Sequence, residues 1–134
     1  MVRTRGLTHL ALAVRDAERS LAFYQRLLGA VPVYRGPGFV QAQTPGSWDV
    51  LVFEEDAARA GAAGGVRHFG FRLVDPADVD AAARAGVEAG GRVIDRGEFC
   101  PGEPYVFLAD PDGYEVELWY ELPTPADPEP TAPA

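Results

Sequence analysis

The stretch that decides the fold is "GVRHFGFRLVD", residues 65–75, because a second form of it occurs near the start of the chain. There, "GLTHLALAVRD", residues 6–16, has glycine, histidine and aspartate at the same relative positions, so that His9 matches His68 at an offset of 68 − 9 = 59 residues. The chain has only these 2 histidines. Their equivalent places in two similar strands indicate an internal duplication and raise the question of a shared role.

The sequence that follows each copy predicts the same order of elements. Residues 17–28 and 76–89 carry apolar side chains at near-helical spacing, and a glycine stands directly after each of these stretches. Three short extended runs, broken by Gly and Pro, come after each helix. The predicted fold is therefore α+β, with tandem βαβββ modules forming a cupped mixed sheet and the helices on its outer faces.

The same pattern predicts the domain organisation. We expect residues 1–122 to form a single domain, in which the first module spans residues 6–56 and the second spans residues 66–121. The Ala/Gly-rich stretch 57–65 is the expected linker. The Pro-rich acidic tail, residues 123–134, is expected to be disordered because it has little apolar surface to bury.

Composition excludes several classes of partner. The net charge of −8 argues against binding to nucleic acid or to an anionic membrane surface. No apolar run approaches the roughly 20 residues that a membrane span needs, and the N-terminus lacks the apolar core of a signal peptide. The single cysteine, Cys100, cannot form an internal disulfide. We therefore expect a cytoplasmic protein that acts on a small-molecule substrate.

Alternation along the predicted strands places three metal-binding side chains on one face. His9 and His68 fall on the face opposite the large apolar residues, beside small residues that leave room, and Glu117 falls on the corresponding face of the last strand. Two imidazoles and one carboxylate suit a divalent ion such as Fe²⁺, Mn²⁺, Zn²⁺ or Ni²⁺. Each residue alone is more simply a polar group at a sheet edge, but their equivalent positions in the repeat favour a metal site.

The other candidate residues follow from the same alternation. Laying "DVLVF", residues 49–53, over "EVELW", residues 115–119, makes Leu51 the counterpart of Glu117, which leaves open coordination positions, as a catalytic metal requires. Besides Leu51, the expected substrate pocket contains three aromatic residues, whose simpler interpretation is core filling. These are Phe53, Phe107 and Trp119.

On these residues the chain resembles the vicinal oxygen chelate superfamily, which includes glyoxalase I, bleomycin-resistance proteins, fosfomycin-resistance enzymes and extradiol dioxygenases. The resemblance is carried by "THLALAVRDAERSLAFYQRLLGA" at the start, "VRHFGFRLVD" in the middle and "FLADPDGYEVELW" at the end. It implies paired βαβββ modules, a divalent metal held by His9, His68 and Glu117, and a homodimer. It also implies a substrate whose neighbouring oxygens bind the metal.

Departures from the family pattern rank the reactions. Leu51, where glyoxalase-type lyases and isomerases place a second ligand, argues against a proton shuttle between two carboxylates. Ala11, where fosfomycin-resistance transferases have threonine, argues against phosphonate chemistry. We rank a dioxygenase-like reaction slightly first, although Phe107 stands where those enzymes usually have a tyrosine.

Two residues are candidates for a catalytic role in such a site. Tyr105 is the candidate to replace the missing tyrosine, and Arg72, on the strand face of His68, is a candidate contact for a substrate carboxylate. The rival interpretation is a metal-free protein that sequesters an aromatic drug or antibiotic, as bleomycin-resistance proteins do.

Overall fold

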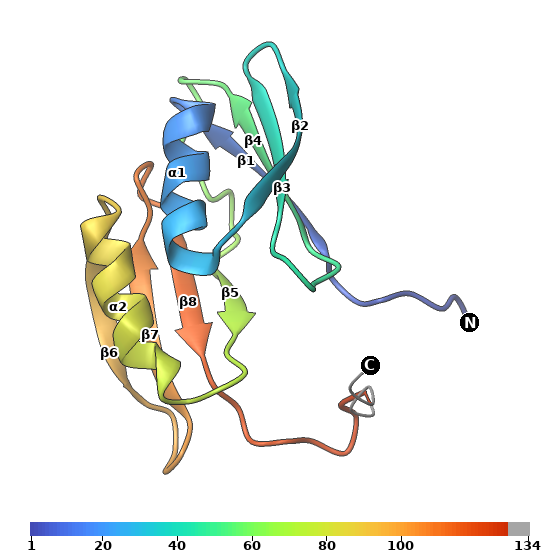
Figure 1. The fold of residues 1–134 in the computed structure, drawn as a ribbon, viewed down its shortest axis with the longest axis vertical. Coiled ribbons are helices and arrows are strands. Elements are labelled where there is room, and N and C mark those ends of the chain that lie inside the picture. The colour runs from blue at the N-terminus through green and yellow to red at the C-terminus, as the bar shows by residue number, and fades with distance from the viewer. Residues whose placement is uncertain (129–134) are drawn as a thin grey trace.

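The computed structural model of the chain describes residues 1–128 and contains two modules with the same order of elements (Figure 1). The first module consists of β1 (His9–Val14), α1 (Ala17–Leu28), β2 (Val31–Gly36), β3 (Phe39–Gln43) and β4 (Val50–Glu55). The second consists of β5 (Phe69–Arg72), α2 (Asp78–Glu88), β6 (Arg92–Glu98), β7 (Pro104–Ala109) and β8 (Glu115–Trp119).

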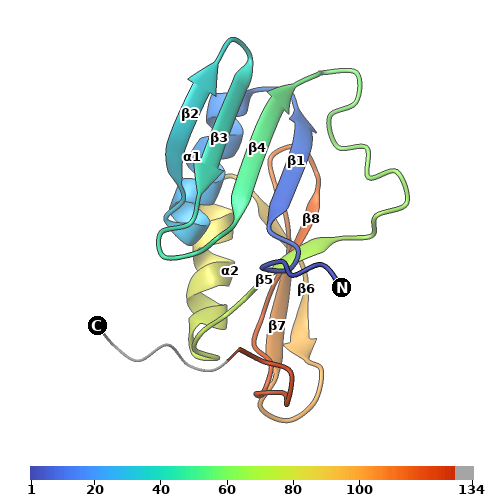
Figure 2. The same ribbon diagram turned by 90° about the vertical axis from the view of Figure 1, so that its right-hand side faces the viewer.

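Each module forms its own 4-stranded sheet, and the two sheets have the same topology. The strand orders are β1-β4-β3-β2 and β5-β8-β7-β6. The first strand of each module pairs in parallel with the last, and the remaining neighbours are antiparallel. In Figure 2 the first sheet is the nearer one and α1 lies behind it. The predicted α+β class and the tandem βαβββ modules are confirmed.

Local sequence explains where α1 begins and ends. Asp16 is the N-cap residue, and its carboxylate accepts a hydrogen bond of 3.1 Å from the Arg19 backbone N–H. The helix ends at Gly29, which adopts a left-handed conformation with φ of 71° and donates its N–H to the Gln25 carbonyl. One side of the helix is apolar and buried, including Phe23 and Tyr24.

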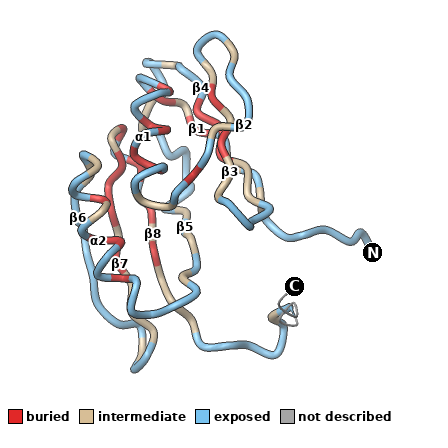
Figure 3. The backbone as a smooth tube through the Cα atoms, viewed as in Figure 1, coloured by how far each residue is buried: buried red, intermediate tan, exposed pale blue. Residues whose placement is uncertain are grey.

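The second helix lies very close to its sheet, and a glycine makes this approach possible. A Cβ atom added at Gly86 of α2 would lie 2.5 Å from a methyl carbon of Leu108 in β7. Leu108 is fully buried. Buried side chains from both modules form one hydrophobic cluster that includes residues of both helices and both sheets. Figure 3 marks the buried positions in red along the backbone. The helices therefore cover the outer faces, as the sequence predicted, and leave the opposite faces free.

Residues 123–128 are the part of the expected tail that the structure describes. They include a turn closed by a hydrogen bond of 3.1 Å from the Asp127 N–H to the Thr124 carbonyl. Arg72 forms an ion pair with Asp127 at 2.9 Å. Residues 129–134 fall outside the described residues. Within residues 1–128, no helix has the length and apolar character needed to cross a membrane.

Candidate functional site

The inner face of the second sheet, which we define as the face opposite α2, carries most of the predicted site residues. Glu117 of β8 pairs with Phe107 of β7 on one side and with Gly70 of β5 on the other. One step along, Trp119 pairs with Tyr105 and with Arg72. The alternate residues of β7 and β8 belong to the buried core beneath α2. The backbone register therefore places these side chains on one free surface.

An open cavity of about 450 Å³ lies on this inner face. It is lined by Phe99, Glu103, Tyr105, Phe107, Glu117, Trp119, Tyr120 and Glu121. The indole of Trp119 lies across the bare backbone of Gly70, where an added Cβ would come within 2.8 Å of a ring carbon. The cavity thus combines aromatic walls with carboxylates, as expected of a site for a small molecule with apolar and polar parts.

His68 lies next to Glu117, which lines this cavity. His68 Nε2 lies 3.8 Å from Glu117 Oε1, which is too long for a hydrogen bond. The ring of Phe107 packs edge-on against the His68 imidazole with ring centroids 4.9 Å apart, and this contact restricts the orientation of the imidazole.

The Glu117 carboxylate is an anion without a hydrogen-bond donor. Partial burial raises the pKa of Glu117, and the neighbouring His68 lowers it to a smaller extent. Over residues 1–128, no group donates a hydrogen bond to this carboxylate. A half-buried carboxylate that lies beside an imidazole and accepts no hydrogen bond is suited to binding a cation.

The geometry of this pair fits a divalent ion. Two donors that each lie about 2.1 Å from one ion can be at most about 4.2 Å apart, so the separation of 3.8 Å allows shared coordination. His9 does not join them within the chain. Among the described residues, no three His, Cys, Asp or Glu side chains come together in a way that could hold a metal. His9 stands at the start of β1 in the other sheet, where it is exposed.

The prediction that Leu51 and Phe53 of the first module line the substrate pocket is wrong. Leu51 and Phe53 are 3% and 0% exposed, and both belong to the hydrophobic core. Phe53 stacks on Tyr24 of α1 with ring centroids 5.4 Å apart. Both side chains therefore face the helix and do not line a cavity.

The register of the first sheet shows how the prediction failed. Val52 pairs with Ala11, as Glu117 pairs with Gly70 in the second sheet. The counterpart of Glu117 is therefore Val52, at an offset of 117 − 52 = 65 residues, whereas the predicted match to Leu51 assumed an offset of 66. A shift of one residue moves a side chain to the opposite face of a strand. The fourth position is still apolar, because valine replaces leucine there.

Neither Tyr105 nor Arg72 is in position to act on a substrate at the His68–Glu117 pair. A Cβ atom added at Gly97 of β6 would lie 3.1 Å from the Tyr105 hydroxyl. Since β6 and β8 flank β7 on opposite sides, this hydroxyl extends away from the strand that carries Glu117. The Arg72 guanidinium is already engaged by Asp127.

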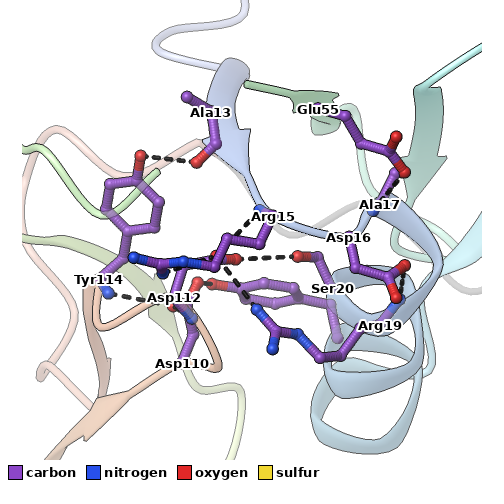
Figure 4. Close-up of polar contacts among 11 residues, drawn as sticks. Ala13, Arg15, Asp16, Ala17, Arg19, Ser20, Glu55, Asp110, Asp112 and Tyr114 are labelled. Carbon is purple, nitrogen blue, oxygen red and sulfur yellow. Dashed lines mark hydrogen bonds and ion pairs between the residues drawn. The ribbon is translucent and has the colours of Figure 1, made fainter. Parts of the chain in front are cut away.

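A buried polar cluster in the β7–β8 turn, which the sequence analysis did not identify, joins the two modules (Figure 4). The Asp112 side chain is fully buried and accepts hydrogen bonds from the Arg15 backbone N–H at 3.0 Å and the Ser20 hydroxyl at 3.3 Å. The guanidiniums of Arg15 and Arg19 pair with the same carboxylate at 3.4 and 3.2 Å. The start of α1 is thereby attached to the turn that leads into β8.

Asp110 completes this cluster. Its carboxylate accepts a hydrogen bond of 2.8 Å from the Tyr24 hydroxyl and two more from the backbone N–H groups of Asp112 and Tyr114. Burial raises the pKa of Asp110 above its ordinary value, although these hydrogen bonds act in the opposite direction. Burial and the same carboxylate raise the pKa of Tyr24 well above its ordinary value. The cluster fixes the position of β8, and therefore of Glu117, relative to the first module.

Comparison with known proteins identifies the family. The sequence model of the Glyoxalase/Bleomycin resistance protein/Dioxygenase superfamily matches residues 6–118, and the protein belongs to this superfamily. Its members generally use divalent metal ions, bind small-molecule substrates and often form dimers.

Individual relatives agree with this assignment. The chain is 37% identical over 125 residues to uncharacterized protein PA2024 of Pseudomonas aeruginosa, covering 87% of this chain and 89% of that protein. It is 25% identical over 115 residues to metallothiol transferase FosB of Lysinibacillus sphaericus, covering 85% and 81%. The crystal structure of a glyoxalase-related enzyme from Fulvimarina pelagi matches with a TM-score of 0.73 at 23% identity, covering 98% and 100%.

Proposed function

We propose that this protein is a metal-dependent enzyme in which His68 and Glu117 of one chain and His9 of a second copy hold a divalent ion next to the inner-face cavity. The observation that carries the proposal is the His68–Glu117 pair, with its donors 3.8 Å apart and no hydrogen bond between them. A divalent ion bound there supplies Lewis-acid chemistry, because it polarises the oxygens of a bound substrate.

The third ligand is assigned to a second copy because His9 is exposed and does not join the pair within the chain. A carboxylate and an imidazole without further ligands are an incomplete set for a stable site. The face of the first sheet that carries His9 is the free face, with His9 and Ala11 both exposed. A homodimer in which this face covers the partner's inner-face cavity would complete the site.

The residues of this chain also constrain the reaction. Val52, in the place equivalent to Glu117, has no titratable group, so the chain offers no second carboxylate there to exchange protons with a substrate. This argues against an isomerisation that needs two opposed bases. We rank a dioxygenase-like reaction slightly ahead of thiol transfer. Thiol transfer remains a candidate because of the similarity to a metallothiol transferase.

The aromatic lining of the cavity supports a second candidate. Tyr105, Phe107 and Trp119 line one cavity and offer flat apolar surfaces to a planar ligand. A metal-free protein that sequesters an aromatic compound would use the same walls. The role of His68 and Glu117 separates the two candidates, since a binder of this kind does not need them as ligands.

Titration of the metal-stripped, untagged protein with Co²⁺, followed by visible absorption, tests the proposal. We expect about one ion per chain, and at least tenfold weaker binding in the His68→Ala and Glu117→Gln proteins. Glu98→Gln on the exposed strand β6 is the matched control and should bind as the native protein does. A native protein that binds no Co²⁺ would overturn the proposal and favour the aromatic binder.

The reaction is tested separately on the metal-loaded protein. Oxygen uptake by the Fe²⁺ form against a panel of catechols is expected for the dioxygenase-like reaction. Metal binding without uptake on any catechol would instead favour thiol transfer, which is measured as loss of free thiol with an electrophilic substrate.

A further inference from the structure

Arg72 lies beside the cavity on the inner face, at the end of β5 away from His68. Arg72 pairs with Trp119 in the backbone register, so its side chain leaves the sheet on the same face as the indole. With a rise of about 3.3 Å per residue, the Cα atoms of His68 and Arg72 are roughly 13 Å apart along the strand. The Trp119 ring lies across Gly70, between these two positions.

A carboxylate from the same chain occupies this arginine. Asp127 accepts hydrogen bonds from both terminal nitrogens of Arg72, at 2.9 and 3.1 Å. The guanidinium also donates to the backbone carbonyls of Glu121 and Leu122, at 3.2 and 3.4 Å. An arginine that donates hydrogen bonds to a carboxylate from two nitrogens has the geometry used to recognise carboxylate ligands.

The segment that supplies this carboxylate is folded around it. The Thr124 backbone N–H and hydroxyl donate to the two Asp127 oxygens at 2.9 and 3.2 Å. The hydrogen bond from Arg72 and those from Thr124 lower the pKa of Asp127 to about 2, so this position strongly favours an anion. The same segment contributes Tyr120 and Glu121 to the cavity wall.

We propose that Arg72 is the anion-binding end of the substrate cavity, and that Asp127 occupies it as an internal carboxylate which an anionic group of the substrate displaces. The inference rests on the proposed function in one respect, namely that the cavity next to Glu117 and Trp119 receives the substrate. The substrate class that fits is a small molecule with a carboxylate or similar oxyanion at one end. Its apolar or planar middle lies over Trp119, and its oxygens bind at the His68–Glu117 end.

The cavity itself is acidic. Its lining includes Glu103, Glu117 and Glu121, and it includes no lysine or arginine. An anionic ligand that enters this wall of carboxylates needs a compensating cation, and Arg72 is placed next to it. Glu121 and Tyr120 are the titratable neighbours of the Arg72 guanidinium besides Asp127.

The experiment compares a charged probe with a neutral probe of the same shape. Benzoate and benzamide are titrated in the presence of EDTA, and binding is followed by tryptophan fluorescence. The chain has 2 tryptophans, so a Trp48→Phe background leaves Trp119 as the reporter. Asp127→Asn removes the internal anion and Arg72→Gln removes the cation. Glu88→Gln removes an equal charge from an exposed ion pair on α2 and is the matched control.

We expect Asp127→Asn to bind benzoate roughly two- to fivefold more tightly than its parent, the range expected when an exposed ion pair stops competing. Benzamide affinity should be unchanged, and Glu88→Gln should match the parent with both probes. In the Arg72→Gln background, Asp127→Asn should give no gain.

Three results would overturn the inference. These are an unchanged benzoate affinity in Asp127→Asn, an equal gain for benzamide, and no detectable benzoate binding by that variant. Because EDTA removes divalent ions, a failure of the proposed metal site would leave the expected benzoate effect intact. The two proposals can therefore fail independently.

Discussion

Mixing two metal-deficient variants provides the sharpest test of a site shared between two copies. His9→Ala and Glu117→Gln each remove one ligand, and each protein alone is expected to lose high-affinity metal binding. If His9 comes from the partner chain, a mixed dimer contains one site with both substitutions and one site with neither. The mixture should therefore regain metal binding that both components lack.

The size of the recovery follows from how often the two kinds of chain pair with each other. Random pairing of equal amounts of the two chains makes mixed dimers about half of all dimers, and each mixed dimer has one intact site of two. About a quarter of the native number of sites should be restored. The assay is unfolding and refolding of the mixed chains, followed by removal of free Co²⁺ and measurement of bound metal per chain.

A second mixture is the matched control. His68→Ala and Glu117→Gln both alter the second module, so every site in their mixed dimer lacks one ligand and none is restored. No recovery in the first mixture would refute a site shared between copies. Equal recovery in both mixtures would show that His68 and Glu117 of one site come from different chains, which contradicts the proposed arrangement.

Three further predictions concern the surroundings of the site. Tyr24→Phe removes the buried hydrogen bond to Asp110 and should lower the free energy of unfolding by about 1–3 kcal/mol in urea titrations; an unchanged midpoint would contradict this. Burial raises the pKa of Asp110 above 3.8, so the folded protein binds this proton more strongly than the unfolded chain does. The stabilisation that results is fully present below pH 3.8 and is lost as the pH rises through the raised pKa. The stability of Asp110→Asn relative to the native protein should therefore increase with pH above 3.8, and a difference independent of pH would argue against the shift. Gly70→Ala places a Cβ 2.8 Å from the Trp119 ring and 2.9 Å from the Glu117 carbonyl oxygen. It should cost about 1–3 kcal/mol and change Trp119 fluorescence, and a native-like emission spectrum would show that the ring does not lie there.

Most of the fold could be predicted from local sequence. The repeated Gly-His-Asp pattern showed the duplication, and the spacing of apolar residues showed where the helices lie. The structure has α1 ending at Gly29, as predicted. Alternation also placed Glu117 on the face opposite the core residues of β8, because the period of a strand is short and depends on neighbouring residues.

The same alternation failed in the first sheet because it needed a correct alignment between modules. "DVLVF" and "EVELW" share few identical residues, so the offset was wrong by one, and Leu51 and Phe53 were assigned to the wrong face. Only the hydrogen-bonded register of β1 with β4 corrected the counterpart of Glu117 to Val52. An error of one residue has no effect on strand propensity but reverses the face of every side chain.

The sequence by itself determined the duplication, the α+β class and the residue types able to bind a metal. Only the tertiary structure decided which of them meet. It brought His68 to Glu117, left His9 on the other sheet, buried Asp112 between the modules and set Asp127 on Arg72. These partners are separated by between 49 and 97 residues in sequence, as for His68 with Glu117 and for Arg15 with Asp112. Contacts over such separations depend on how the sheets and helices pack, and that packing has no local period in the sequence.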